Sequence, residues 1–123
     1  MIPSAASSTR IPYLSIHVRI GNLQYPDFEF DVDALVDTGF DGGLTVPQGL
    51  IPSRVYSPNR QWCEFADGNR VLVPVYLGFL TIGSLQPIDA YVMELPHQAL
   101  LGRAVTNHFR LTFFYGRQVV LEQ

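Results

Sequence analysis

Short stretches of alternating apolar and polar residues run through much of the chain. Residues 11–20 place four apolar side chains on one face of an extended strand: Leu14, Ile16, Val18 and Ile20. A period of two is the pattern of a half-buried β-strand. Residues 28–37 begin with the same alternation and end in a continuous apolar run. This change predicts a second strand that passes from a sheet surface into a core.

The remainder of the chain predicts more strands and little helix. Asp67-Gly68 separates two apolar runs and is typical of a β-hairpin turn. Further strands are expected over residues 42–47 and 85–94 and on both sides of Tyr115-Gly116. Residues 103–110 could form about two helical turns. Many short strands with one short helix place the chain in the all-β class, as a barrel or a sandwich.

The length of 123 residues fits one domain. Residues 1–10 are small and polar, and we expect a flexible N-terminal arm there, with the domain over residues 11–123. Charged residues make up 15% of the chain and apolar residues 47%. Average domains carry about a quarter charged residues. This composition indicates apolar surface that something covers, such as a second subunit.

Charge and cysteine content exclude several kinds of partner and compartment. The net charge is −3 with no run of basic residues, which argues against a nucleic acid or an anionic membrane as partner. Cys63 is the only cysteine, so no disulfide within the chain is possible. The first ten residues lack the apolar segment of a secretory signal, and no apolar run approaches the roughly 20 residues of a membrane span. We expect a soluble, cytoplasmic protein.

Metal and cofactor chemistry find no support in the sequence. The three histidines, His17, His97 and His108, share no ligand spacing with Cys63, so no metal site is expected. The chain has neither a Gly-x-Ser-x-Gly nucleophile turn nor a phosphate-binding loop. Cys63 lies in an expected strand, where it would be an inert packing residue.

Asp37 is the unusual residue, because it ends the apolar run Ala34-Leu35-Val36 and precedes Thr38 and Gly39. A carboxylate in that place is costly unless its charge is stabilised. It could be a turn residue, half of a structural ion pair, or a catalytic acid whose surroundings tune its pKa. An Asp-Thr-Gly tripeptide arises by chance in roughly a few per cent of chains of this length. The tripeptide alone therefore favours the turn.

Its context is more specific. A second apolar unit, Leu100-Leu101-Gly102, begins 61 residues after Gly39, and the Asp67-Gly68 hairpin lies between them. With these units in this order, the chain resembles the retropepsin-like aspartic proteases over about residues 11–122. It is most similar to small bacterial members with the stretch Asp-Thr-Gly-Phe-x-Gly-x-Leu-x-x-Pro, here Asp37 to Pro47. The resemblance implies a closed β-barrel with one short C-terminal helix, in a homodimer.

The resemblance also implies an aspartic endopeptidase whose catalytic residues are Asp37, Thr38 and Gly39. Asp37 of each subunit would meet at the twofold axis and share one proton, because two such close carboxylates cannot both ionise. The pair would activate water against a peptide carbonyl without metal or cofactor. The Thr38 hydroxyls would bond across the axis, and Gly39 would let the substrate backbone approach.

Other roles follow from the same resemblance. Leu100, Gly102 and Arg103 are expected to be structural, with an Asp41–Arg103 ion pair tying the Asp37 loop to the helix; the alternative is that both charges are solvated. The hairpin would be a flap that closes over the substrate. Residues expected at the substrate are Phe40, Asp41, Ala66, Asp67, Gly68 and Leu101. Whether Trp62 and Phe65 face the cleft or the core stays open.

Two positions depart from the family pattern. Ala104 replaces a common Asp or Asn, and Phe40 is bulkier than the usual Ala or Ser. Two other interpretations remain: a peptide-binding or dimerisation module that no longer cleaves, and an unrelated β-barrel with a chance tripeptide.

Overall fold

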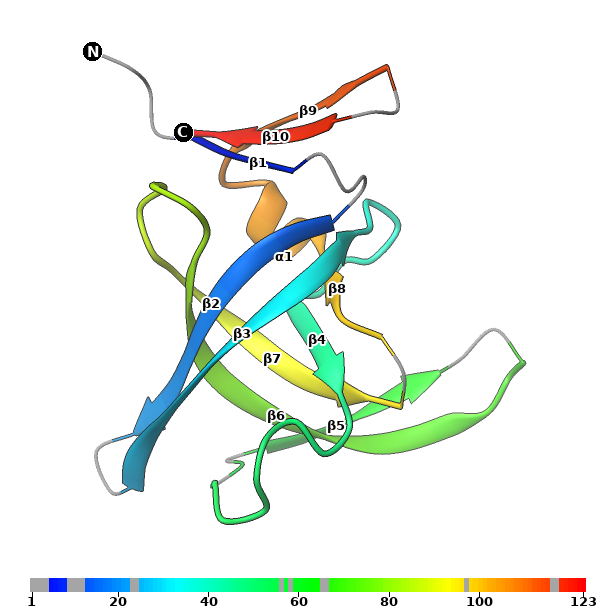
Figure 1. The fold of residues 1–123 in the computed structure, drawn as a ribbon. Helices are drawn as coiled ribbons and strands as arrows, with labels where there is room; N and C mark the ends of the chain where they lie inside the picture. The colour runs from blue at the N-terminus through cyan, green and yellow to red at the C-terminus, as the bar shows by residue number, and fades with distance from the viewer. Residues whose placement is uncertain are drawn as a thin grey trace.

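The computed structural model describes residues 5–8, 13–22, 25–55, 57, 59–64, 67–96, 98–115 and 118–123. These residues form ten strands and one helix (Figure 1). In chain order they are β1 (Ala5–Ser8), β2 (Tyr13–Asn22), β3 (Tyr25–Val36), β4 (Leu44–Pro47), β5 (Asn59–Glu64), β6 (Arg70–Thr81), β7 (Ile88–Leu95), β8 (Leu100–Leu101), α1 (Arg103–Thr106), β9 (Arg110–Phe114) and β10 (Gln118–Glu122). The protein is therefore mostly β, with one short helix.

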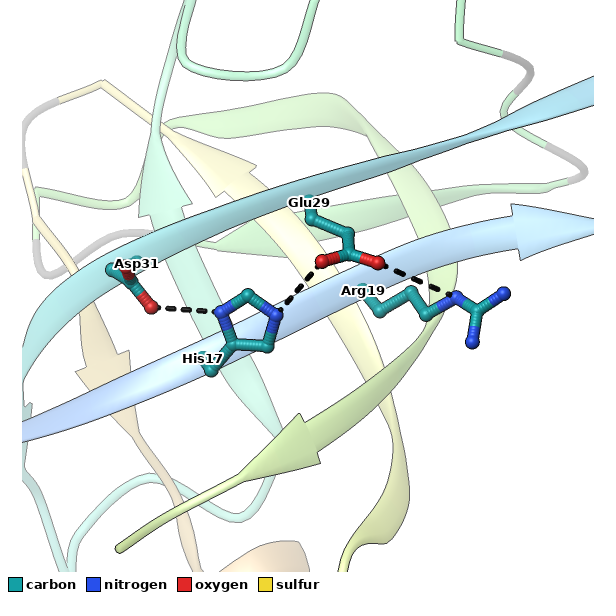
Figure 2. Close-up of polar contacts among 4 residues, drawn as sticks. All are labelled: His17, Arg19, Glu29 and Asp31. Carbon is teal, nitrogen blue, oxygen red and sulfur yellow. Dashed lines mark hydrogen bonds and ion pairs between the residues drawn. The ribbon is translucent and has the colours of Figure 1, made fainter.

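Strands β2 and β3 form a long antiparallel hairpin. The alternating apolar residues of β2 are all buried, as their period predicts: Leu14, Ile16, Val18 and Ile20. The opposite face is exposed and charged (Figure 2). There His17 Nδ1 lies 2.8 Å from Asp31 Oδ1, and its Nε2 lies 3.1 Å from Glu29 Oε2. Hydrogen bonds to Asp31 and then Glu29 raise the pKa of His17, because an imidazolium donates to both carboxylates.

Seven strands form one sheet in the order β2-β3-β8-β4-β7-β6-β5. An additional β2–β6 pairing links two strands that are distant in this order, from His17↔Thr81 to Ile20↔Gly78. The main core contains buried side chains from β2, β3, β4, β6 and β7. The β2–β6 pairing is the contact that closure of the sheet requires. A complete barrel stays a prediction, because β8 contributes only two residues to the ring.

Strands β5 and β6 form the hairpin that the Asp67-Gly68 pattern predicts, and it projects from the body of the molecule in Figure 1. Gly68 has a φ of 85°, a left-handed conformation that favours glycine. Asp67 Oδ1 accepts a hydrogen bond from the Asn69 backbone N–H at 3.0 Å. At the base of the hairpin, Val73 and Val75 pack with Met93 in a second apolar cluster. The hairpin therefore has an apolar base of its own.

The end of the chain differs from expectation in two respects. Helix α1 spans only Arg103–Thr106, not the two turns expected over residues 103–110, because β9 begins at Arg110. Strands β9 and β10 pair as predicted, and β1 pairs along β10, forming a three-stranded sheet beyond α1 (Figure 1). Within the flexible arm expected over residues 1–10, the structure instead places Ala5–Ser8 in a strand that is paired with β10. In the described part of the chain, no helix has the length and apolar character needed to cross a membrane.

Candidate active site

The position of Asp37 is fixed by two parallel strands. β3 pairs with β8 at Leu35↔Leu100 and Val36↔Leu101. The Asp37 backbone N–H continues this ladder by donating to the carbonyl of Leu101 at 3.0 Å. Val36 is buried, whereas Asp37 is half-buried. The apolar run thus ends where the strand leaves the core, which places the carboxylate at the surface of the fold.

A tight turn orients the Asp37 carboxylate. Its Oδ1 accepts a hydrogen bond from the Gly39 N–H at 2.9 Å, and the Phe40 N–H donates to the Asp37 carbonyl at 3.2 Å. No described residue forms an ion pair with Asp37, so the described part of the chain gives no support to a structural ion pair. The turn interpretation is confirmed. Thr38 and Gly39 are exposed at its tip.

Residues Leu100–Gly102 pack directly behind this turn. Leu101, which was expected at the substrate, has no exposed surface. Its role is to pair with Val36 and to accept the Asp37 N–H. Gly102 is required by close packing: a Cβ there would overlap the Gly42 carbonyl oxygen and the ring of Phe40.

The predicted Asp41–Arg103 ion pair is absent among the ion pairs of the described residues, and both side chains are exposed. Backbone hydrogen bonds connect the loop to α1 instead. Arg103 N–H donates to the Phe40 carbonyl at 2.8 Å, and Ala104 N–H donates to the Gly42 carbonyl at 3.1 Å. Since these bonds need no particular side chain, the connection forms without the charges, which remain in solvent.

Beside the Asp37 turn lies a cavity of about 670 Å³. One wall is the loop of residues 40–43, and the other walls come from strands β5, β6 and β7, with Ala104 of α1 at one side. Two of the expected substrate residues, Phe40 and Asp41, line this cavity. Asp67 and Gly68 lie in the exposed turn of the hairpin and do not line it, and Ala66 and Phe65 lie outside the described residues.

Two aromatic side chains of this region could face either the cleft or the core. Phe40 does both, because it lines the cavity and packs against the Val73, Val75 and Met93 cluster. Trp62 does neither: it is 57% exposed, outside the cavity lining, with the Arg70 guanidinium 5.3 Å from its ring centroid.

Strands β6 and β7 form a part of the cavity that was not predicted from the sequence, in particular Leu77, Asp89 and Tyr91. A signal was present, because the run Val73–Leu80 is apolar on both faces. A strand of that kind is covered on both sides or leaves an apolar surface for a ligand. Leu77 and Tyr91, which are paired across the strands, are 50% and 63% exposed.

On the other side of this sheet, Glu94 holds the loop between β4 and β5. It is only 7% exposed. Its Oε1 accepts the Tyr76 hydroxyl proton at 2.9 Å, and its Oε2 accepts the Gly49 N–H at 3.1 Å. Burial and, to a smaller extent, Glu94 raise the pKa of Tyr76 to about 12. The phenol therefore stays protonated and able to donate.

The described residues contain no group of three or more His, Cys, Asp or Glu side chains that could hold a metal ion. His17 contacts carboxylates, His108 is exposed, and His97 lies outside the described residues. Burial raises the pKa of the Cys63 thiol, which lines the cavity. A raised thiol pKa makes this cysteine a poor nucleophile.

Comparison with protein-family models and with curated proteins finds no match for this chain. Among solved structures, the chain is similar to a retropepsin-like aspartic protease from Rickettsia conorii, with 14% sequence identity and a TM-score of 0.48. The match covers 98% of this chain and 94% of that one. Values this low do not establish a family, so the function has to be argued from the residues themselves.

Proposed function

We propose that this protein is an aspartic endopeptidase that acts as a homodimer. The observation that supports it most is the presentation of Asp37. Its backbone is fixed between β3 and β8, one carboxylate oxygen is oriented by the Gly39 N–H, and the other receives no hydrogen bond from a described residue. An oriented, half-buried carboxylate with a free oxygen is what an acid–base catalyst requires.

In this proposal a second copy of the chain supplies the second acid. Each chain carries one Asp-Thr-Gly, and the exposed Thr38 and Gly39 form the tip through which two copies would meet. Two Asp37 carboxylates in contact would share one proton and titrate as a pair, as in the aspartic proteases. The ionised member takes a proton from water, which attacks the peptide carbonyl. The protonated member donates to the developing oxyanion, and a proton then passes to the leaving nitrogen.

The substrate in this proposal is an extended peptide. The cavity between the loop of residues 40–43 and the β5–β6 hairpin would hold it, and that loop follows the Asp37 turn directly in the chain. An extended peptide would add its backbone to the strand edges there, with its side chains in pockets on either side.

The test uses hydrolysis of a mixed peptide library at pH 4–6, read by mass spectrometry. We expect Asp37→Asn to abolish cleavage and to leave the sedimentation of the dimer unchanged. Asp31→Asn is the matched control, since it makes the same chemical change on the exposed face of β3, and it should retain activity. Full cleavage by Asp37→Asn, or a molecule that stays monomeric under all conditions, would refute the proposal.

A second candidate is a peptide-binding or dimerisation module that does not cleave. It is favoured by the Gly39 hydrogen bond, because a turn role alone gives Asp37 a structural reason to be present. The two candidates differ in turnover: saturable peptide binding without products at any pH, unaffected by pepstatin, would select the module.

A further inference from the structure

The cavity that begins at Phe40 is negatively charged. Three carboxylates line it: Asp41 from the loop, Glu64 from β5 and Asp89 from β7. No arginine is among the described residues that line it, and the chain contains no lysine. Because these acids come from three separate segments, the composition of any one stretch does not reveal that they share a cavity.

None of these three carboxylates is in an ion pair with a described residue, although Arg70 lies opposite Glu64 in the β5–β6 ladder. All three side chains are exposed, and none forms an ion pair or a hydrogen bond with a described residue. Elsewhere the protein does pair such charges, since Asp31 and Glu29 both contact His17 (Figure 2). Carboxylates of one sign around a cleft with apolar walls create a negative potential that attracts a cation.

Apart from Gln61, the other large side chains that line the cavity are apolar or aromatic. Met93 belongs to the second apolar cluster and Phe40 packs against it, and Leu77 and Tyr91 add exposed apolar surface. A Cβ on Gly43 would lie 2.5 Å from the Tyr91 carbonyl oxygen, so this glycine allows the loop to lie against β7. Apolar walls below a charged rim suit a side chain with a long apolar stem and a cationic end, and the aromatic rings can also face a guanidinium.

The cavity shares Phe40 with the Asp37 turn, whereas Asp37, Thr38 and Gly39 are not among its lining residues. Phe40 is both a lining residue and the donor to the Asp37 carbonyl, and Asp41 follows it directly. A volume of about 670 Å³ lies within the range of ligand pockets, about 300–1,000 Å³. It exceeds the size of one side chain, so backbone of an extended peptide fits as well.

We propose that this cavity is a specificity pocket for a basic residue, arginine or lysine, close to the bond that is cleaved. The inference rests on the proposed endopeptidase function and narrows its substrate class to peptides with a cationic side chain.

The test compares peptides that differ at one position. A mixed library is digested at pH 6, where carboxylates are generally ionised, and the cut sites are sequenced. We expect arginine or lysine to be enriched about tenfold at one fixed position relative to the cut. Each contact between the cation and a partly solvated carboxylate is weak, and several such contacts together give a factor of this size. A matched pair of peptides with arginine or leucine at that position then gives kcat/KM for the wild type and variants.

The double variant Glu64→Gln, Asp89→Asn should remove most of the preference for arginine, measured as the ratio of kcat/KM for the arginine peptide to kcat/KM for the leucine peptide. Asp31→Asn, a carboxylate outside the cavity, should keep the preference. Added salt should weaken the preference in the wild type. Cleavage without enrichment of basic residues, or a preference that survives the double variant, would overturn the pocket and leave the endopeptidase proposal standing.

If no peptide is cleaved, the endopeptidase proposal fails and binding still decides the pocket. Fluorescence anisotropy with the same two labelled peptides measures their affinity for the wild type and the double variant. Tighter, salt-sensitive binding of the arginine peptide that the double variant loses supports a basic-residue pocket. Equal affinity for both peptides overturns it.

Discussion

The hydrogen bond between Tyr76 and Glu94 allows a sharp test of what holds the β5–β6 hairpin and the preceding loop together. Tyr76→Phe removes only the hydroxyl that donates to Glu94 Oε1 at 2.9 Å. Both side chains are buried. Among the described residues, Glu94 then keeps the Gly49 N–H as its remaining side-chain partner. The change leaves the ring in place and creates no large cavity.

A hydrogen bond to a charged group contributes about 1.5–3 kcal/mol. We therefore expect Tyr76→Phe to lower the free energy of unfolding by about 2 kcal/mol and Tm by roughly 5–10 °C in a domain of this size. Urea unfolding and thermal scans at one fixed protein concentration measure both quantities, since association would make Tm concentration-dependent. Tyr91→Phe is the matched control, because Tyr91 is 63% exposed; it should stay within about 0.5 kcal/mol of the wild type.

High pH gives the same test a second readout. The pKa of Tyr76 is raised to about 12 in the fold, whereas an unfolded tyrosine ionises near 10. Between these values the unfolded state binds fewer protons, so wild-type stability is full below about pH 10 and falls as pH rises toward 12. Tyr76→Phe should lack this component. If Tyr76→Phe is no less stable than Tyr91→Phe and keeps the alkaline slope, the assigned role of the bond is wrong.

Other expectations follow from single contacts. Gly102→Ala should lower the free energy of unfolding by about 1–3 kcal/mol in urea melts, because its Cβ overlaps the loop and Phe40; shortening Phe40 in the same chain should recover part of that loss. Because the pKa of His17 is raised in the fold, its protonated form stabilises the fold below the unfolded pKa, and this stabilisation is lost as pH rises through the folded pKa. His17→Gln should remove this pH dependence of the free energy of unfolding, which is worth under about 1 kcal/mol at an exposed site. An unchanged pH profile of stability in the variant would contradict the assignment. Cys63 should react with a disulfide reagent at pH 8 more slowly than free cysteine, because burial raises its pKa; an equal rate would contradict its placement.

The sequence by itself determined the elements whose causes are local. The alternation of Leu14 to Ile20 predicts β2 and its buried face, because successive side chains of a strand point to opposite sides. Asp67-Gly68 predicts the hairpin, because a left-handed turn needs glycine. The turn at Asp37 could also be predicted from the sequence, because its hydrogen bond joins Asp37 to Gly39, only two residues further along the chain. In each case the residues that decide the structure are neighbours in the chain.

Only the tertiary structure decided the features that depend on distant segments. Asp41 and Arg103 have opposite charges, yet no ion pair joins them in the described part of the chain, and backbone hydrogen bonds connect the loop to α1. Leu101 lies behind the turn with no exposed surface, and Ala5–Ser8 become a strand because β10 offers an edge to pair with. Asp41, Glu64 and Asp89 meet at one cavity although more than 20 residues separate each from the next. Local patterns fix backbone conformation, but the partner of a charge is fixed only when the packing of the sheet brings separate strands together.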